Sequence, residues 1–119
     1  MCIRDRASPH RLVQMLLEGG LDRIAQAKGA LARGDIAQKG LMLGKATDII
    51  IGLRDGLNAE KSDNKEYVQR LEGLYVYMSN RLMEANLHND ADMLDEVAQL
   101  LITVKEGWDA IGAPQGVAQ

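Results

Sequence analysis

Four stretches of the chain carry apolar residues at the three- and four-residue spacing of amphipathic helices. In the stretch over residues 65–88, one set of apolar positions shares a face about 120° wide, as expected of a helix that packs on a core. This set consists of Val68, Leu71, Leu74, Tyr75, Met78, Leu82 and Ala85. The pattern contains no strand-like alternation, and it therefore predicts helices around one shared core.

A second apolar stripe lies on roughly the opposite side of the same stretch. Val76, Met83 and Leu87 repeat at spacings of seven and four residues, where a soluble helix usually carries charge. In the preceding stretch, residues 49–51 are three consecutive isoleucines that span about 200° of a helix, so they cannot all face one core. Both features predict apolar surface that remains exposed or is covered by a partner.

Capping residues indicate where the helices begin. Ser8, Asp35 and Asp90 each have a side-chain oxygen that can accept a hydrogen bond from a first-turn amide, and Pro9 suits the first helical position. The segment 112–114, Gly-Ala-Pro, is typical of a helix stop. Helices are therefore expected over residues 8–34, 35–58, 65–88 and 90–111, with the longest internal loop over 59–64.

Short connections between long amphipathic helices place sequence neighbours antiparallel in space. The predicted fold is all-α, an antiparallel up-down four-helix bundle over residues 8–112, and 119 residues leave room for one such domain. Residues 1–7 are expected to be a disordered or non-native segment, and residues 113–119 a flexible tail. The predicted core includes Leu71, Leu74, Tyr75, Met78, Leu82, Val97, Leu101, Val104 and Trp108. The apolar stripes of the first and fourth helices run from Leu12 to Leu31 and from Met93 to Ile111.

The segment from Leu74 to Asn86 has the pattern Leu-Tyr-x-Tyr-Met-x-x-Arg-Leu-x-x-Ala-Asn, which resembles the signature of the flagellar secretion chaperone FliS family. Ser8-Pro-His-Arg-Leu12, Lys45-Ala-x-Asp-Ile-Ile50 and Trp108 occur in the order that the family shows. The resemblance covers about residues 8–111. It implies an antiparallel helical bundle that binds the C-terminal segment of flagellin, prevents its polymerisation in the cytoplasm and delivers it to the flagellar export apparatus.

The first six residues, Met-Cys-Ile-Arg-Asp-Arg, do not fit this resemblance. Family members usually carry a longer segment there, often with a tyrosine, that folds back over the flagellin groove. We expect a truncated gene or translated non-native sequence at residues 1–6, so self-capping by this segment is not expected.

Glycines form a second unusual pattern, on the helix expected over residues 35–58. Gly40, Gly44, Gly52 and Gly56 follow a four-residue ladder with Asp48 as its middle member. Each glycine in a helix interior costs up to about 1 kcal/mol relative to alanine. One interpretation is a smooth groove in which a partner helix lies close. The other is a soft helix in a mobile chaperone.

Polar residues of the third helix also allow two interpretations. An aromatic beside a guanidinium, as at Tyr77 and Arg81, is enriched at interface centres. Alternatively, Arg81 and Glu84 form an exposed ion pair of small energetic value, with Tyr77 lying over neighbouring methylenes. Asn86, one turn before the next loop, either satisfies loop backbone groups or binds a partner. The partner-binding surface is expected to comprise Ile49, Ile51, Leu53, Leu57, Leu74, Val76, Tyr77, Arg81, Met83, Asn86 and Leu87.

Composition excludes several classes of partner. A net charge of −3 and a pI of about 5.3 give no basic footprint for nucleic acid or anionic lipid. The apolar runs are far shorter than the roughly 20 residues of a membrane span, so no membrane insertion is expected. With one cysteine, Cys2, no internal disulfide can form, which is consistent with a reducing compartment. The expected location is the bacterial cytoplasm.

The sequence contains no recognisable set of catalytic residues. His10 and His88 are the two histidines, and neither belongs to a Glu-x-x-His motif or a Cys/His cluster, so no metal site is expected. Ser8 and Ser79 lack a base and acid partner, and no phosphate-binding loop is present. We therefore expect neither an enzyme nor a cofactor. The alternative to a chaperone is a structural or regulatory homo-oligomer that pairs through the second apolar stripe. The chaperone is expected to be a monomer or a weak homodimer.

Overall fold

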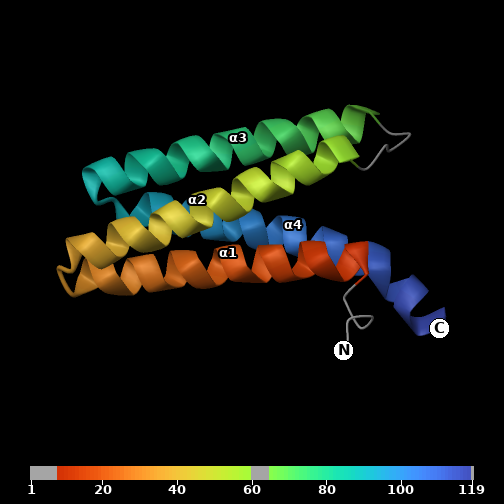
Figure 1. Cartoon of the computed structure of the whole chain (residues 1–119), viewed down its shortest axis with the longest axis horizontal. Helices are drawn as coiled ribbons and strands as arrows, with labels where there is room; N and C mark the ends of the chain where they lie inside the picture. Colours follow the sequence, from red (N-terminus) through yellow and green to blue (C-terminus); the bar gives the residue numbers. More distant parts are fainter. Residues whose placement is uncertain (1–7, 60–64, 119) are drawn as a thin grey trace.

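The computed structural model describes residues 8–59 and 65–118. Within these ranges the chain forms four helices, α1 (Pro9–Ala32), α2 (Ile36–Ala59), α3 (Lys65–His88) and α4 (Ala91–Ala118). Each helix runs back along its predecessor, and α4 returns to contact α1, which closes the ring (Figure 1). The predicted all-α four-helix bundle is therefore confirmed. The expected non-native segment 1–7 and loop residues 60–64 lie outside the described ranges.

Side-chain caps begin the helices as predicted. The Ser8 hydroxyl oxygen accepts a hydrogen bond from the Arg11 backbone N–H at 3.1 Å, with Pro9 at the first helical position. Asp35 Oδ1 accepts from the Gln38 backbone N–H at 3.1 Å, and Asp90 Oδ1 accepts from the backbone N–H groups of the first turn of α4. These bonds satisfy amides that have no partner within their own helix.

The turns after α1 and α3 use left-handed residues. Gly34 has φ of 78° and Asn89 has φ of 54°, a region that glycine and asparagine adopt more readily than other residues. The backbone N–H of the following residue then reaches the carbonyl five residues back, from Asp35 to Ala30 at 2.8 Å and from Asp90 to Ala85 at 3.1 Å. Such bonds stop a helix and reverse the chain in a few residues.

The predicted end of the fourth helix is wrong. The Gly-Ala-Pro segment at residues 112–114 does not stop α4, which continues to Ala118 and projects past the start of α1 (Figure 1). Glycine and proline weaken a helix without making it impossible, and proline signals a probable end rather than an obligatory one. Residues 113–118 are therefore helical, while the flexibility proposed for 113–119 stays a prediction.

The core runs along the axis of the bundle. Met78, Leu82, Val97 and Leu101 are buried as predicted, together with Tyr75. Leu71, Leu74, Val104 and Trp108 are half-buried and pack against its edge. Completely buried alanines lie near the ends of α1 and α3 and in the first half of α2, and we call this part of the bundle the alanine end, defined by Ala27, Ala30, Ala46 and Ala85.

Some residues of the predicted core-facing stripes lie outside the buried core. Leu12 is 51% exposed, Leu16 36% and Ile111 53%, although each belongs to a predicted core-facing stripe. These residues belong to the part of the bundle where α1 begins and α4 nears its end, which we call the open end. Periodicity gives the direction of a side chain around its helix. It does not give the distance to the next helix.

Candidate partner-binding surface

An apolar cavity of about 510 Å³ lies at the open end. All four helices contribute to its wall, which consists of leucine, valine, aromatic, proline and glycine residues: Pro9, Leu12, Val13, Leu16, Leu17, Gly52, Leu53, Gly56, Leu57, Tyr67, Leu71, Tyr75, Val104 and Trp108. Leu12, Leu16 and Tyr67 are among the exposed large hydrophobic side chains. Apolar side chains left open to solvent in a group are typical of a binding surface.

A second depression lies between α2 and α3 and has a volume of about 410 Å³. We call it the α2–α3 groove, defined by Leu43, Gly44, Thr47, Asp48, Ile51, Arg54, Val76, Ser79, Asn80, Leu82, Met83 and Asn86. Met83 is 66% exposed and Ile51 is 45% exposed. This groove is more polar than the cavity, since amide, hydroxyl and charged side chains share its wall with the apolar ones.

The structure divides the predicted partner-binding residues between several places. Ile51, Val76, Met83 and Asn86 line the α2–α3 groove, and Leu53 and Leu57 line the apolar cavity. Leu87 is exposed, whereas Leu53 is buried and Leu74 is half-buried against the core. Ile49 packs toward α1, because a Cβ added at Gly19 would lie 3.4 Å from Ile49 Cδ1. The predicted residues therefore do not form one continuous surface.

The glycines of the α2 ladder lie in open surroundings, where an added Cβ atom would have room. A Cβ built at Gly44, Gly52 or Gly56 would meet no atom within 4 Å, and one at Gly40 would lie 3.9 Å from Asn86 Oδ1. Packing within the described part of the chain therefore does not require these glycines. Gly44 forms part of the α2–α3 groove, while Gly52 and Gly56 form part of the cavity wall. Both interpretations of the ladder stay predictions.

Tyr77, Arg81 and Glu84 belong to a cluster that joins α3 to α4. The Tyr77 hydroxyl donates to Glu96 Oε2, and Arg81 Nε donates to Glu96 Oε1 at 2.9 Å. Arg81 also contacts Glu84 at 3.3 Å and lies 5.9 Å from the centroid of the Tyr77 ring. The hydrogen bond from Tyr77, supported by that from Arg81, lowers the pKa of Glu96, and the same bond raises the pKa of Tyr77.

Sequence reasoning missed Glu96, and this changes the interpretation of the cluster. The ion pair was expected within the third helix, from Arg81 to Glu84, whereas the closer contact of Arg81 is the one across to α4. Tyr77 is bound through its hydroxyl in the same way. Residue spacing within one helix does not reveal a partner on a neighbouring helix. That contact depends on which helices are adjacent and on their register.

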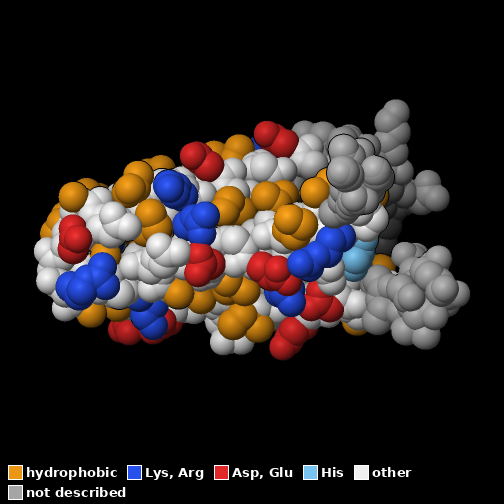
Figure 2. Space-filling model, turned by 60° about the horizontal axis from the view of Figure 1, so that its bottom comes forward, with side chains coloured by type: hydrophobic (Ala, Val, Ile, Leu, Met, Phe, Trp, Pro, Cys, Tyr) orange, Lys and Arg blue, Asp and Glu red, His pale blue; other side chains and the backbone are white. Residues whose placement is uncertain are grey.

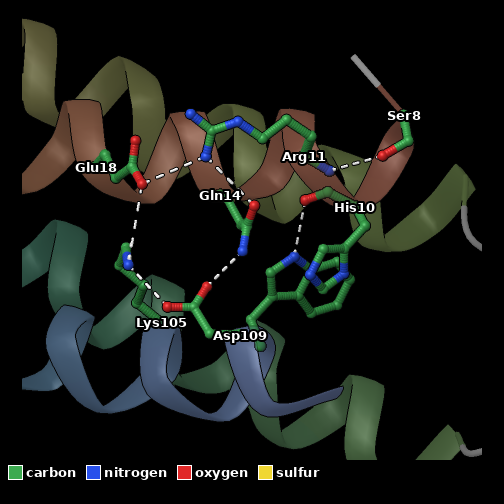
Figure 3. Close-up of polar contacts among 8 residues, drawn as sticks. Ser8, His10, Arg11, Gln14, Glu18, Lys105 and Asp109 are labelled. Atoms are coloured by element: carbon green, nitrogen blue, oxygen red, sulfur yellow. Dashed lines mark hydrogen bonds and ion pairs between the residues drawn. The ribbon is translucent and has the colours of Figure 1, made fainter. Parts of the chain in front are cut away.

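On another side of the bundle, polar contacts hold the first half of α1 on α4 (Figure 3). Trp108 Nε1 donates to the His10 backbone oxygen at 3.0 Å, and the two rings stack with centroids 4.7 Å apart. Gln14 Nε2 donates to Asp109 Oδ1 at 2.6 Å, and Lys105 Nζ donates to Asp109 Oδ2 at 2.8 Å. Trp108 therefore both lines the cavity and anchors the beginning of α1.

These contacts also shift the ionisation of two groups. The hydrogen bond from Lys105, followed by that from Gln14, lowers the pKa of Asp109 below its ordinary value of 3.8. The same bond to Asp109 raises the pKa of Lys105. Glu18 completes the network, with an oxygen 3.9 Å from Lys105 Nζ and 3.4 Å from Arg11 Nη1.

Lys39 is a buried charged residue that the sequence did not indicate. It is 3% exposed, and its Nζ donates to the Asn86 backbone oxygen at 2.8 Å and to Asn89 Oδ1. Asn86 was expected either to satisfy loop backbone groups or to bind a partner, and both interpretations stay predictions. In the structure Lys39 binds this turn through the Asn86 backbone carbonyl, and Asn86 is among the residues that line the α2–α3 groove.

Charges of both signs are mixed with apolar side chains over the face that Figure 2 shows. Across residues 8–59 and 65–118, no helix is both long enough and apolar enough to cross a membrane. Within the same ranges, no three His, Cys, Asp or Glu side chains are placed to hold a metal ion together.

Comparison with known proteins gives a consistent result. The family described as "Flagellar protein FliS" matches residues 4–115. "Flagellar secretion chaperone FliSB" of Pseudomonas aeruginosa is 52% identical over 105 residues, which cover 88% of this chain and 82% of the relative. "Flagellar secretion chaperone FliS" of Vibrio cholerae is 45% identical over 105 residues, covering 88% and 76%. "Flagellar secretion chaperone FliS" of Salmonella typhimurium is 43% identical over 106 residues, which cover 88% of this chain and 77% of the relative.

Proposed function

Because the chain belongs to the FliS family and is therefore a flagellar secretion chaperone, we propose that it binds the disordered C-terminal segment of flagellin in the bacterial cytoplasm. Binding prevents the segment from polymerising early and presents it to the flagellar export apparatus. A chaperone of this family works by binding and release, so no catalytic residue or cofactor takes part.

The observation that carries the proposal is the apolar surface that the core leaves open. The cavity at the open end exposes Leu12 and Leu16, and the α2–α3 groove exposes Ile51 and Met83. Burial of apolar area releases about 25 cal/mol per Å², which can offset the conformational entropy that a disordered segment loses when it docks. A segment that forms helix on binding places apolar residues every three or four positions, a spacing that suits depressions along helices.

Within this proposal, the contact residues are divided between the two depressions. One apolar face of the segment lies along the α2–α3 groove, where it contacts Ile51, Val76 and Met83. Leu87 extends this contact beyond the groove. Leu57 and the other cavity residues take apolar side chains at the open end. The chaperone is a monomer or weak homodimer before it binds, and the complex contains one copy of each chain.

Titration of a peptide with the flagellin C-terminal sequence into the whole chain tests this function. We expect one-to-one binding, a negative heat-capacity change from apolar burial and a gain of helical circular dichroism in the peptide. Binding should change little between low and high salt, because screening weakens charge-driven complexes far more than apolar ones. Absence of both heat and a circular-dichroism change would contradict the chaperone assignment. Binding that salt abolishes would contradict the apolar surface, and self-association through the groove would appear as a dimer that the peptide does not dissociate.

A pair of matched variants locates the binding surface. Met83→Glu places a charge in the α2–α3 groove, whereas Gln99→Glu adds the same charge at an exposed position of α4 outside both depressions. We expect Met83→Glu to weaken peptide binding by at least about tenfold, since a buried unpaired charge is strongly unfavourable at an interface. Gln99→Glu should bind like the wild type. Equal affinities for all three proteins would remove the groove from the binding surface.

A further inference from the structure

Lys39 is the buried cation of α2, and its surroundings give it an unusual set of partners. Its side chain lies within the bundle at 3% exposure, yet the acceptors within reach are neutral oxygens, the Asn86 carbonyl and the Asn89 side-chain amide. Removing an ammonium from water is costly unless hydrogen bonds and an opposing field compensate for it. Its position must therefore provide such compensation.

The end of α3 provides it. The last carbonyls of a helix have no intrahelical partner, and they concentrate the negative end of the helix dipole. Asn86 lies in the last turn of α3, and Asn89 follows the helix in the left-handed conformation with φ of 54°. Lys39 thus acts as a cap on α3, although it belongs to the first turn of α2, where its own backbone N–H donates to the Asp35 carbonyl at 3.0 Å.

This contact lies at one end of the α2–α3 groove. The helices α2 and α3 lie close together where α2 ends and α3 begins, and they diverge toward the start of α2 (Figure 1). Lys39 spans the two helices at the diverging end. Asn86 takes part in both features, because its carbonyl binds Lys39 and its side chain lines the groove.

We propose that Lys39 is a positioning residue for cargo binding. Its ammonium fixes the end of α3 relative to the start of α2, and this fixes the width of the α2–α3 groove in which the flagellin segment docks. The role in cargo binding rests on the proposed function, whereas the role in helix spacing does not. Lys39 itself makes no contact with the cargo.

Three variants separate this role from simple stabilisation. Lys39→Met keeps the apolar stem and removes every N–H donor, while Lys39→Arg keeps a cation with donors. Asn89→Gly removes one acceptor and retains a residue that adopts positive φ without strain, so it preserves the turn if Lys39→Met fails to fold. Lys45→Met is the matched control, because Lys45 is an exposed lysine of the same helix.

The first measurement is made without cargo. Spin labels at Leu41→Cys and Leu87→Cys, both exposed positions, report the separation of α2 and α3 in a Cys2→Ser background. We expect Lys39→Met and Asn89→Gly to lengthen the mean label distance and broaden its distribution relative to the wild type. We expect Lys39→Arg to give a distribution close to that of the wild type. An unchanged distribution in the folded Lys39→Met or Asn89→Gly protein would overturn the proposal, even if its melting temperature falls.

The second measurement is peptide affinity in the unlabelled proteins, well below their melting temperatures. Loss of hydrogen bonds to a charged group should weaken binding by about tenfold in Lys39→Met, with recovery in Lys39→Arg and no change in Lys45→Met. Wild-type affinity in Lys39→Met, or in Asn89→Gly if that is the variant that folds, would overturn the role in cargo binding. If the wild type itself binds no peptide, the proposed function fails, and the label distances still decide whether Lys39 fixes the helix spacing.

Discussion

At the alanine end of the bundle Ala27, Ala30 and Ala85 are completely buried, whereas at the open end Leu12 and Leu16 are 51% and 36% exposed. Small side chains at a helix contact let the helix axes approach, and large side chains hold them apart. The alanine end therefore has a completely buried core of small side chains, although α2 and α3 diverge there (Figure 1), and the open end has a cavity of about 510 Å³. Under the proposed function, the cavity at the open end is available to cargo in addition to the α2–α3 groove.

The largest expected effect tests whether packing really differs between the ends. Leu101 is completely buried in the middle of α4, so Leu101→Ala should lower the free energy of unfolding by about 2–5 kcal/mol. Leu16→Ala removes the same atoms from the wall of an open cavity and should cost about 1 kcal/mol or less. Urea unfolding at constant m-value measures both changes. Equal losses would mean that the open end is packed as firmly as the core.

Overpacking tests the alanine end from the opposite direction. Ala85→Leu adds a branched side chain at a completely buried position, and it should destabilise the fold by about 1–3 kcal/mol. Ala110→Leu makes the same substitution at an exposed position of α4 and should leave the melting temperature nearly unchanged. A stable Ala85→Leu protein would show that the helices at this end can separate without loss, which would contradict the close packing described above.

A smaller effect of opposite sign is expected from the glycine ladder. A Cβ at Gly52 would meet no atom within 4 Å, so Gly52→Ala should stabilise the helix by up to about 1 kcal/mol. Peptide titration of the same variant then decides between the two interpretations of the ladder. Weaker binding indicates that cargo approaches the α2 backbone closely, and unchanged binding indicates a helix that is merely soft. A destabilised variant would contradict the open surroundings of Gly52.

The elements of the fold could be predicted because their signals are local. Ser8, Asp35 and Asp90 cap the helices that they were expected to cap, and α3 has the bounds that its periodicity gave. Where a signal permits more than one outcome, the prediction was less reliable. Pro114 is compatible with both a stop and a continued helix, and α4 continues.

The surface was harder to predict because it depends on distances between helices. Exposure of Met83 and Leu87 followed from the width of one helix face, and that prediction is confirmed, while Val76 on the same stripe is half-buried. The cavity at the open end and the contacts of Lys39 and Glu96 depend instead on side chains that meet from different helices. A single sequence gives the faces of the helices, and it does not give their separations.

The smallest expected effect concerns how the open end is held together. At the alanine end, Lys39 binds neutral oxygens that do not titrate, whereas at the open end Asp109 is an ionised acceptor for Lys105 and Gln14. Because these bonds lower the pKa of Asp109 in the folded state, its contribution to stability is complete above the ordinary value of 3.8. It is lost as pH falls through the lowered value.

Acid should therefore loosen the attachment of α1 to α4 at the open end, and Asp109→Asn should remove this part of the pH dependence. The substitution keeps one amide oxygen that can accept from one of the two donors, and the amide does not ionise in this range. Trp108, the single tryptophan, precedes Asp109 in the chain, and its indole donates to the His10 carbonyl. Its fluorescence therefore reports the change. Urea unfolding between pH 6 and pH 2 should show a shallower loss of stability in Asp109→Asn than in the wild type. Identical pH profiles would mean that Asp109 contributes nothing beyond apolar contacts, and that the open end is held by Trp108 and its neighbours through packing alone.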